Sequence, residues 1–438
     1  MSSTVIERTL VALHVAVFAA LPIVGLTAGP SYAALIFGLG GVQLVGTAAV
    51  RRAPPRLDPV LSVLAFVFAV FSWASVVWSI APDRSWRGAL QVTGIFAASL
   101  VVLSPSHRPR STRTVDRLFQ WMGIAFVLGA AILCADALTG YHLQSLLVTG
   151  KAEPGTKYNR GADYLALIVW PALARASARR NRACLLLVAG SALAVLMLGL
   201  SATGRAAGLV GAAALALALY SPRLLARCLA VATAVTAVAT PLLLKILAEH
   251  RSFIAAHLLV TPHLRQSGLD RLHIWGAMSA RVFERPFLGW GLSSAKALPI
   301  RGGNYPHNQW LQLWVETGAV GVAIALALAL VVLFRVRRTV PLRVQPCALA
   351  AFAAAMTISL ANFEISTDSW WAALVATASL FALLGDDVIM GAEGADGSAG
   401  APDSRSGLPR LAASWTTTTY ADDTMPHRAE PPTRFGAK

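Results

Sequence analysis

The residues best suited to chemistry lie in one stretch, residues 270–321, where arginines, a histidine and a glutamate stand among glycines and tryptophans. Arg271 and Trp275 are four positions apart, so a helix would place them on one face. His307 and Asn308 directly precede a long apolar run. Arginine binds phosphate oxygens through planar, permanently charged donors, and histidine acts as a base near neutral pH. This pattern predicts a site that binds an anion and moves a proton.

Further ionisable residues lie in the same stretch. Glu316 is nine residues after His307 and so about two and a half turns into the following apolar run. Because an acid inside a membrane helix is costly unless it is paired, we expect Glu316 to contact an arginine or the site around His307. Asp270 is expected to cap the helix that carries Arg281 and Arg285 and that ends at the next proline.

Metal and cofactor chemistry are not predicted. Four histidines of the long polar segment are separated by 7, 6 and 10 residues, which matches no familiar ligand pattern; they are His250, His257, His263 and His273. The four cysteines form no CxxC pair. Gly289-Trp290-Gly291 lacks the third glycine and the downstream acid of a dinucleotide fingerprint, so it is predicted to be a turn.

Composition identifies the class of protein. Of 438 residues, 56% are hydrophobic and 13% are charged, and the mean hydropathy is +0.61, as in proteins embedded in a membrane. About 20 apolar residues span a bilayer as a helix. The sequence predicts an all-α integral membrane protein with about 12 transmembrane helices. They lie near residues 9–28, 31–50, 60–80, 88–103, 119–138, 162–174, 183–200, 205–220, 224–247, 309–334, 346–363 and 370–385.

Arginines in alternate loops set the predicted orientation, since cytoplasmic loops retain positive charge. They occur in residues 51–59, 104–118, 175–182, 221–227 and 335–345. Both termini are then cytoplasmic, in a bacterial inner membrane. The net charge of +16 therefore reflects membrane topology, and nucleic acid is not a predicted partner. A basic patch on the opposite face, from Lys245 to Arg301, indicates binding of an anion.

The apolar runs and the polar segments predict four parts of the chain. Residues 1–247 hold the first nine helices, residues 248–308 form one long periplasmic loop with short helices, and residues 309–385 hold the last three. Residues 386–438 are rich in Gly, Ala, Ser, Pro and Thr and are predicted to be a disordered cytoplasmic tail.

The motifs of residues 270–321 resemble the signature of the O-antigen ligase and O-antigen polymerase superfamily, and the layout is most like that of the ligases. The pattern R-x-x-x-W, P-F-L-G-W-G and H-N-x-x-L-Q-x-x-x-E-x-G-x-x-G begins at Arg271 and ends at Gly321. Ser201-Ala202-Thr203-Gly204-Arg205 resembles the family's outer-face arginine at the start of a helix.

The resemblance implies an enzyme that transfers a glycan from undecaprenyl pyrophosphate at the periplasmic face, without a metal or a nucleotide sugar. Arg205 and Arg271 would hold the pyrophosphate, with Arg281 and Arg285 as less certain helpers. His307 would act as the base or orient the acceptor. The supporting residues are Asn308, Glu316 and Trp275.

The acceptor stays open. A ligase uses a sugar of lipid A core, whereas a polymerase uses a second lipid-linked repeat of O-antigen or exopolysaccharide. Protein-directed oligosaccharyl transfer is a third alternative. A small-anion transporter is the alternative from another class, but coupled transport usually requires ionisable groups near the bilayer midplane. Asp136 and Lys245 are instead expected near the outer ends of their helices, and His14 is the only ionisable side chain well inside the first.

Overall fold

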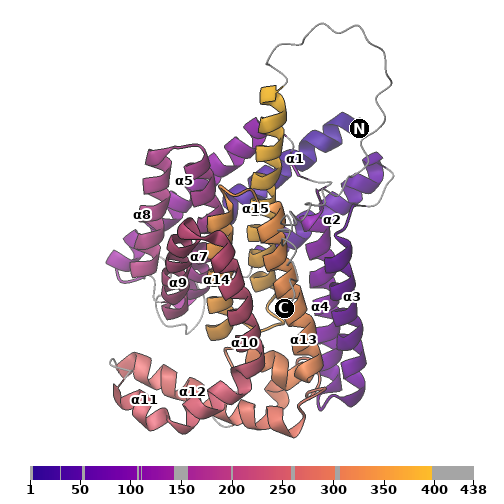
Figure 1. Cartoon of the computed structure of the whole chain (residues 1–438), viewed down its shortest axis with the longest axis vertical. Helices are drawn as coiled ribbons and strands as arrows, with labels where there is room; N and C mark the ends of the chain where they lie inside the picture. Colours follow the sequence, from indigo (N-terminus) through magenta and orange to yellow (C-terminus); the bar gives the residue numbers. More distant parts are fainter. Residues whose placement is uncertain are drawn as a thin grey trace, which may run out of the picture. The chain divides into compact units, whose positions relative to one another are not determined.

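The computed structural model describes residues 3–29, 31–51, 55–105, 108–109, 111–142, 156–198, 201–257, 262–300 and 306–396. Two units are separate by their contacts, Met1–Gly394 and Ala395–Lys438, and the helices below belong to the first, apart from the last two residues of α15. Among the described residues every regular element is a helix (Figure 1).

The helices follow the apolar runs closely. The first nine are α1 (Ser3–Thr27), α2 (Ser31–Arg51), α3 (Pro59–Ala74), α4 (Pro82–Leu103), α5 (Thr112–Leu138), α7 (Thr156–Ala178), α8 (Arg182–Leu198), α9 (Ala202–Tyr220) and α10 (Pro222–Glu249). A 3-10 turn, η1 (Ser75–Trp78), extends α3. After the polar segment come α13 (Gln309–Thr339), α14 (Gln345–Ala361) and α15 (Asp368–Asp396). Each of the predicted apolar runs therefore lies on a helix.

Eight of the described helices are long and apolar enough to cross a membrane, and three apolar helices are shorter. The shorter ones are Ser31–Gly46, Arg182–Leu198 and Gln345–Ala361. The prediction of an all-α membrane protein is confirmed, whereas the number of 12 spans stays a prediction.

Capping residues fix several helix starts. The Asp58 carboxylate accepts hydrogen bonds from the N–H groups of Val60 and Leu61 at the start of α3. Ser201 accepts from the N–H of Gly204 at the start of α9. Each cap satisfies backbone donors that have no partner within their own helix. The caps therefore help to determine where these helices begin.

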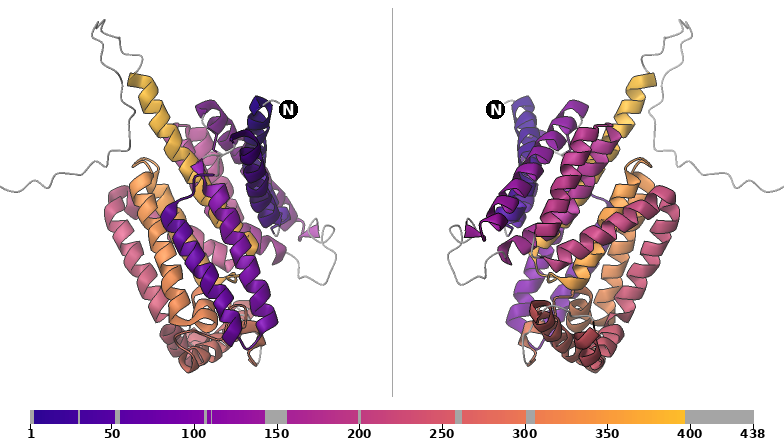
Figure 2. Two further views of the ribbon diagram at one scale, coloured as in Figure 1. Left: turned by 90° about the vertical axis from the view of Figure 1, so that its right-hand side faces the viewer. Right: turned by 90° about the vertical axis from the view of Figure 1, so that its left-hand side faces the viewer.

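The predicted periplasmic segment contains α11 (Arg251–His257), α12 (Pro262–Glu284) and a short 3-10 turn, η3 (Ala295–Ala297). In Figures 1 and 2, α11 and α12 lie crosswise at one end of the long helices α10 and α13. Leu244 of α10, Ile274 and Met278 of α12, and Val315 of α13 belong to one buried apolar cluster. This cluster fixes α12 against two of the long helices.

A stack of aromatic rings crosses the centre of the first unit. Tyr32, Tyr164, Phe363 and Trp370 follow one another with ring centroids 4.8, 5.6 and 4.9 Å apart. They come from α2, α7, the α14–α15 connection and α15. Stacked aromatic pairs add to the stabilisation from burial alone. The connection after α14 is thus held by the core rather than left as a free loop.

Two predicted boundaries were wrong. Asp270 does not cap α12, because this helix begins eight residues earlier at Pro262, where a proline suits the first helical position. The predicted tail was to begin at residue 386, but α15 continues to Asp396. The sequence has no proline between these positions to stop the helix. The rest of the predicted tail lies outside the described residues.

Candidate functional site

The end of α14 joins two of the predicted site segments. The Arg271 guanidinium donates a hydrogen bond through Nη1 to the carbonyl of Ala361, at 2.8 Å. The Asn308 side-chain amide donates to the preceding carbonyl, that of Leu360, at 2.9 Å. The last carbonyls of a helix have no partner within it, so they are free to hold these two side chains. Arg271 of α12 and Asn308, next to His307, are therefore fixed at adjacent points.

Trp275 and Asn308 position the histidine from both sides. The indole N–H of Trp275 donates to the carbonyl of Pro306 at 2.5 Å. Asn308 is the N-cap of α13, with its side-chain oxygen 2.9 Å from the N–H of Leu311. Between these anchors the His307 backbone has a φ of 49°, which non-glycine residues seldom adopt. The His307 side chain is half-buried.

The electrostatics of His307 favour a neutral ring. Burial and, to a smaller extent, the Arg271 cation lower the pKa of His307 to about 4. Both effects act against the charged imidazolium. At neutral pH the imidazole is therefore uncharged.

Arg205 lies in the first turn of α9 and is half-buried. Within the part of the chain that the structure describes, no hydrogen bond or ion pair engages its guanidinium. The Ser201 cap fixes the start of the helix four residues earlier. A half-buried cation that has no partner among the described residues is suited to an anionic ligand.

Asp163 of α7 connects these two arginine positions. The carboxylate is fully buried and accepts hydrogen bonds from Ser201 Oγ at 2.7 Å and from Asn362 Nδ2 at 2.6 Å. Ser201 begins the helix of Arg205, and Asn362 follows Ala361, the residue that holds Arg271. Neither Asp163 nor Asn362 was predicted from the sequence. A lone acid inside an apolar run is the signal that would have found Asp163.

Glu316 is buried in α13, with 1% of its side chain exposed. Its Oε1 accepts from Gln312 Nε2 at 2.9 Å and from the N–H of Ala295 at 3.4 Å. No ion pair between Glu316 and an arginine occurs among the described residues, and the expected contact with the site around His307 stays a prediction. Gln312 also accepts a hydrogen bond from the N–H of Ile365, at 3.2 Å. Glu316 therefore ties α13 to two connecting segments.

The P-F-L-G-W-G motif fits into an interruption of α13. Gly318 has φ 59° and ψ −163°, a conformation that is essentially restricted to glycine. A Cβ atom there would lie 2.4 Å from the carbonyl carbon and oxygen of Phe287. The N–H of Ala319 donates to the carbonyl of Pro286 at 2.8 Å. The two motifs thus form one structural unit beside Glu316.

Arg281 and Arg285 have partners within their own segment. Arg281 forms an ion pair with Glu284, with Nη1 2.9 Å from Oε2. The Arg285 guanidinium carbon lies 4.2 Å from the centre of the Trp290 ring. No contact between either arginine and His307 occurs among the described residues, and their predicted helper role stays a prediction.

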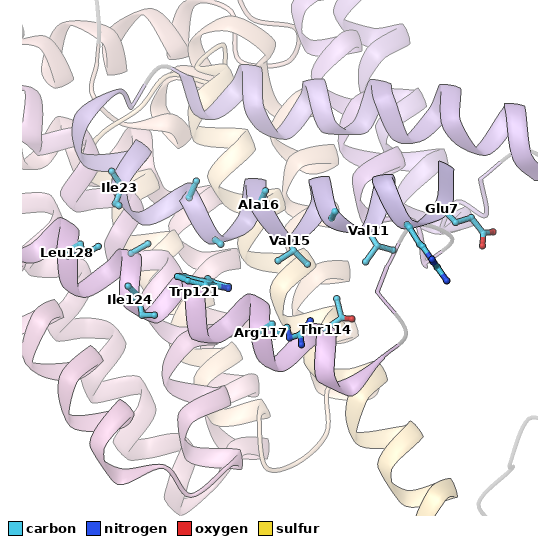
Figure 3. A pocket seen from close by; sticks show the side chains of 15 residues that line it. Glu7, Val11, Val15, Ala16, Ile23, Thr114, Arg117, Trp121, Ile124 and Leu128 are labelled. Carbon is cyan, nitrogen blue, oxygen red and sulfur yellow. The ribbon is translucent and has the colours of Figure 1, made fainter. Parts of the chain in front are cut away.

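The predicted site residues form no metal-binding cluster among the described residues, and they do not line the cavity described below. The described residues contain no group of three or more His, Cys, Asp or Glu side chains placed to hold a metal. A cavity of about 880 Å³ lies between α1 and α5 (Figure 3), and none of the predicted site residues lines it.

The region that contains these motifs matches a known protein family. Residues 187–326 match the family described as O-antigen ligase, and this region contains Arg205, Arg271 and His307. Asp163 and Asn362 lie outside it. A comparison with curated proteins finds no match. This region of the chain is therefore similar to the O-antigen ligase family.

Proposed function

We propose that the protein is an O-antigen ligase-like glycosyltransferase. It would move a glycan from undecaprenyl pyrophosphate to a sugar of lipid A core at the periplasmic face of the inner membrane. One observation carries the proposal. Arg271 and Asn308 bind successive carbonyls at the end of α14, so a phosphate-binding cation and the histidine next to Asn308 are held at one place.

In this mechanism the arginines bind the leaving group. Arg205 and Arg271 hold the pyrophosphate oxygens and stabilise the negative charge that grows as the bond from the sugar carbon to phosphate breaks. His307, which is uncharged at physiological pH, accepts the proton of the acceptor hydroxyl as the new glycosidic bond forms. The anionic pyrophosphate bound by Arg271 offsets the cation that disfavours the imidazolium, and so makes His307 a stronger base in the complex. The proton then leaves to solvent or to the departing pyrophosphate. A metal ion is not required by this scheme.

The other predicted residues support this arrangement. Trp275 fixes the Pro306 carbonyl, and Asn308 caps α13. Glu316 links α13 to the segment around Ala295. Arg281 and Arg285 are exposed enough to exchange their present partners for phosphate or sugar groups of the substrate. Their contribution is expected to be smaller than that of Arg205 or Arg271.

The proposed topology has 12 spans, cytoplasmic termini and a periplasmic segment at residues 248–308. Contacts between loops support it, because loops predicted to face the cytoplasm contact one another. The described ion pairs of this kind are Arg335–Asp58, Arg108–Asp386 and Arg179–Asp116, at 2.7, 3.0 and 2.6 Å, together with Arg175–Asp116. On the opposite side, Lys296 forms an ion pair with Glu364 at 2.7 Å.

Deletion of the gene in its host tests the proposed function. Gel analysis of glycolipids should show lipid A core without long-chain glycan, while the lipid-linked polymer accumulates. A copy with His307→Ala or Arg205→Ala should not restore attachment. His273→Ala, an exposed histidine of the same segment, is the matched control and should restore it.

Unchanged glycan attachment in the deletion strain would contradict the proposal. A strain that keeps single repeats on lipid A core but loses chain length would instead assign the protein as a polymerase, which uses the same lipid-linked donor.

A further inference from the structure

We infer that Asp163 is a positioning residue of the transfer reaction, which sets the two pyrophosphate-binding arginines relative to each other. This inference rests on the proposed function and adds a role for a residue outside the region that matches the family. Asp163 is buried on α7, so it acts through its neighbours and not by touching the substrate.

Hydrogen bonds on both carboxylate oxygens connect Asp163 to two elements. Oδ1 accepts from Ser201, and Oδ2 accepts from Asn362. Ser201 is the cap of α9, one turn before Arg205. Asn362 is the residue after Ala361, whose carbonyl holds Arg271. A single rigid group therefore links the backbone supports of both arginines.

The guanidinium of Arg271 adds to this link. Arg271 is close enough to interact electrostatically with Asp163. A buried carboxylate requires partners for its charge. Its two donors and the nearby guanidinium provide them. Moving α9 or the end of α14 would leave this carboxylate under-satisfied, so the arrangement resists displacement.

An exchange of the two side chains tests the role. Asn362→Asp places a carboxylate against Asp163, and we expect a roughly tenfold or larger rise in KM for the lipid-linked donor, as for loss of a charged hydrogen bond. Adding Asp163→Asn restores a carboxylate–amide pair in the opposite sense and should bring KM back towards the wild-type value. Asn362→Ala, which adds no charge, provides a second variant if Asn362→Asp does not fold.

Coupling to Arg271 separates positioning from a general structural role. With Arg271→Ala present, Asn362→Ala should have little further effect on KM, because the guanidinium that it positions is gone. The inference would be overturned if the effects of Arg271→Ala and Asn362→Ala on KM multiplied in the double variant. It would also be overturned if the exchange of Asp163 and Asn362 did not restore KM in a protein with wild-type thermal stability. Absence of glycan transfer by the wild-type protein would contradict the proposed function itself.

A second inference comes from the groove between α1 and α5. We propose that it binds a phospholipid with an anionic headgroup. Its volume is about 880 Å³, and most of its lining residues are apolar. Of the polar ones, Glu7, Thr114 and Arg117 gather towards one end, and Ile23 and Leu128 lie at the other (Figure 3). Arg8, which also lines the groove, follows Glu7 in α1.

The dimensions fit one acyl chain length. Val11 and Ile23 are twelve residues apart along α1, which is about 18 Å at 1.5 Å per residue. One leaflet of the hydrocarbon core is about 15 Å thick, half of the full ~30 Å. Beyond the groove α1 and α5 approach closely, since a Cβ on Gly129 would lie 2.9 Å from Leu26. The groove therefore closes about one leaflet away from the arginines.

Charge selects the headgroup. Two arginines and one glutamate leave the polar end with net positive charge, which favours an anionic over a zwitterionic phosphate headgroup. Arg8 and Arg117 lie at the end that the predicted topology places in the cytoplasmic leaflet. The lipid in question is therefore an anionic phospholipid of that leaflet.

Fluorescence quenching tests this proposal, because Trp121 lines the groove and is 58% exposed. The purified full chain is mixed with detergent micelles that contain brominated phosphatidylglycerol or brominated phosphatidylcholine. The part of the quenching that is lost in Trp121→Phe should be stronger for phosphatidylglycerol. Arg8→Gln with Arg117→Gln should remove this preference.

Arg113→Gln is the matched control, since Arg113 is exposed in the same helix turn but does not line the groove. This variant should keep the preference. Equal quenching of Trp121 by both lipids would overturn the proposal. The proposal would also be overturned if the protein were a dimer in which neither brominated lipid quenched Trp121, because a second copy of the chain would then occupy the groove.

Discussion

At the scale of single residues, the account depends on a neutral histidine beside a fixed arginine. Arg271 has two effects on the site, because its charge attracts phosphate and disfavours protonation of His307. The anchor on the Ala361 carbonyl uses one of the five guanidinium donors.

The acid limb of the activity profile reports the protonation of His307. A histidine with its ordinary pKa of 6.5 would be half protonated at pH 6.5, whereas a pKa of about 4 keeps it neutral well below that pH. We therefore expect kcat/KM for the lipid-linked donor to stay level from pH 8 to about pH 5 and to fall towards pH 4. Steady-state rates across this range provide the measurement, and a fall centred near pH 6.5 would contradict it.

The stability of the fold should also decrease as the pH falls, because of the same lowered pKa of His307. Because the folded-state pKa of His307 lies below the unfolded value, the unfolded chain binds more protons between pH 6.5 and pH 4. The contribution of His307 is complete above pH 6.5 and is lost as the pH falls towards 4. As the pH is lowered through this window, the midpoint temperature of thermal unfolding should therefore fall more steeply for the wild type than for His307→Gln. Parallel curves for the two proteins would contradict this assignment.

Arg271→Lys tests the geometry of the cation rather than its charge. Lysine keeps the charge but lacks the planar fork that can bind both a carbonyl and a phosphate. We expect KM for the donor to rise about tenfold or more, in line with the loss of a charged hydrogen bond. Arg281→Lys is the comparison, and its effect should be smaller. Equal effects of the two substitutions on KM would count against the special role of Arg271.

At this scale the sequence predicts residues that belong to a recognisable motif. Arg271, Trp275 and Asn308 were selected from their spacing and from the resemblance of their motif. Arg271 and Asn308 meet at the end of α14, and Trp275 binds the carbonyl of Pro306. Asp163 and Asn362 were not selected, because their partners are 38 and 199 residues away in the chain. Such contacts depend on tertiary packing, which spacing along the sequence does not encode.

At the scale of elements, the interruption of α13 determines how the site segment packs. The turn around Gly289 fits against the backbone of Glu316 and Thr317, where a Cβ atom would lie 2.6 Å away. The N–H of Gly291 donates to the carbonyl of Glu316 at 2.9 Å. The sequence predicts the turn and a helix that contains Glu316. It does not predict the break, because apolar periodicity continues through Gly318.

Gly318→Ala should destabilise the protein strongly. The backbone conformation is unfavourable for any residue with a Cβ, at a cost of about 1–3 kcal/mol, and the added methyl would also clash with Phe287. Gly94→Ala is the control, since no atom lies within 4 Å of its Cβ position on α4. Thermal unfolding in detergent should show a lower midpoint for Gly318→Ala only. Equal midpoints for both variants would contradict the described break.

At the scale of the whole chain, loop charge is the basis of the predicted sidedness. The ion pairs Arg335–Asp58 and Arg108–Asp386 join segments that the charge rule assigns to one face. Helix positions were predicted well because an apolar run of membrane length leaves few alternatives. The crosswise packing of α12 was not predicted, since its buried residues are few and their partners lie on distant helices.

Cysteine labelling in spheroplasts tests the sidedness. In a variant whose four native cysteines are replaced by serine, a membrane-impermeant maleimide should label His273→Cys in intact spheroplasts and Arg113→Cys only after lysis. Both positions are exposed, so accessibility differs only through the membrane. Labelling of Arg113→Cys before lysis would contradict the proposed orientation.

The most direct test of the central claim is glycan transfer by the purified protein. The full chain in detergent, with an undecaprenyl-pyrophosphate-linked glycan and lipid A core as the acceptor, should yield glycosylated lipid A core, measured by mass spectrometry. His307→Ala, Arg205→Ala and Arg271→Ala should each lose most of this product, whereas His273→Ala should retain it. No product from the wild-type protein, or equal product from His307→Ala, would contradict the account.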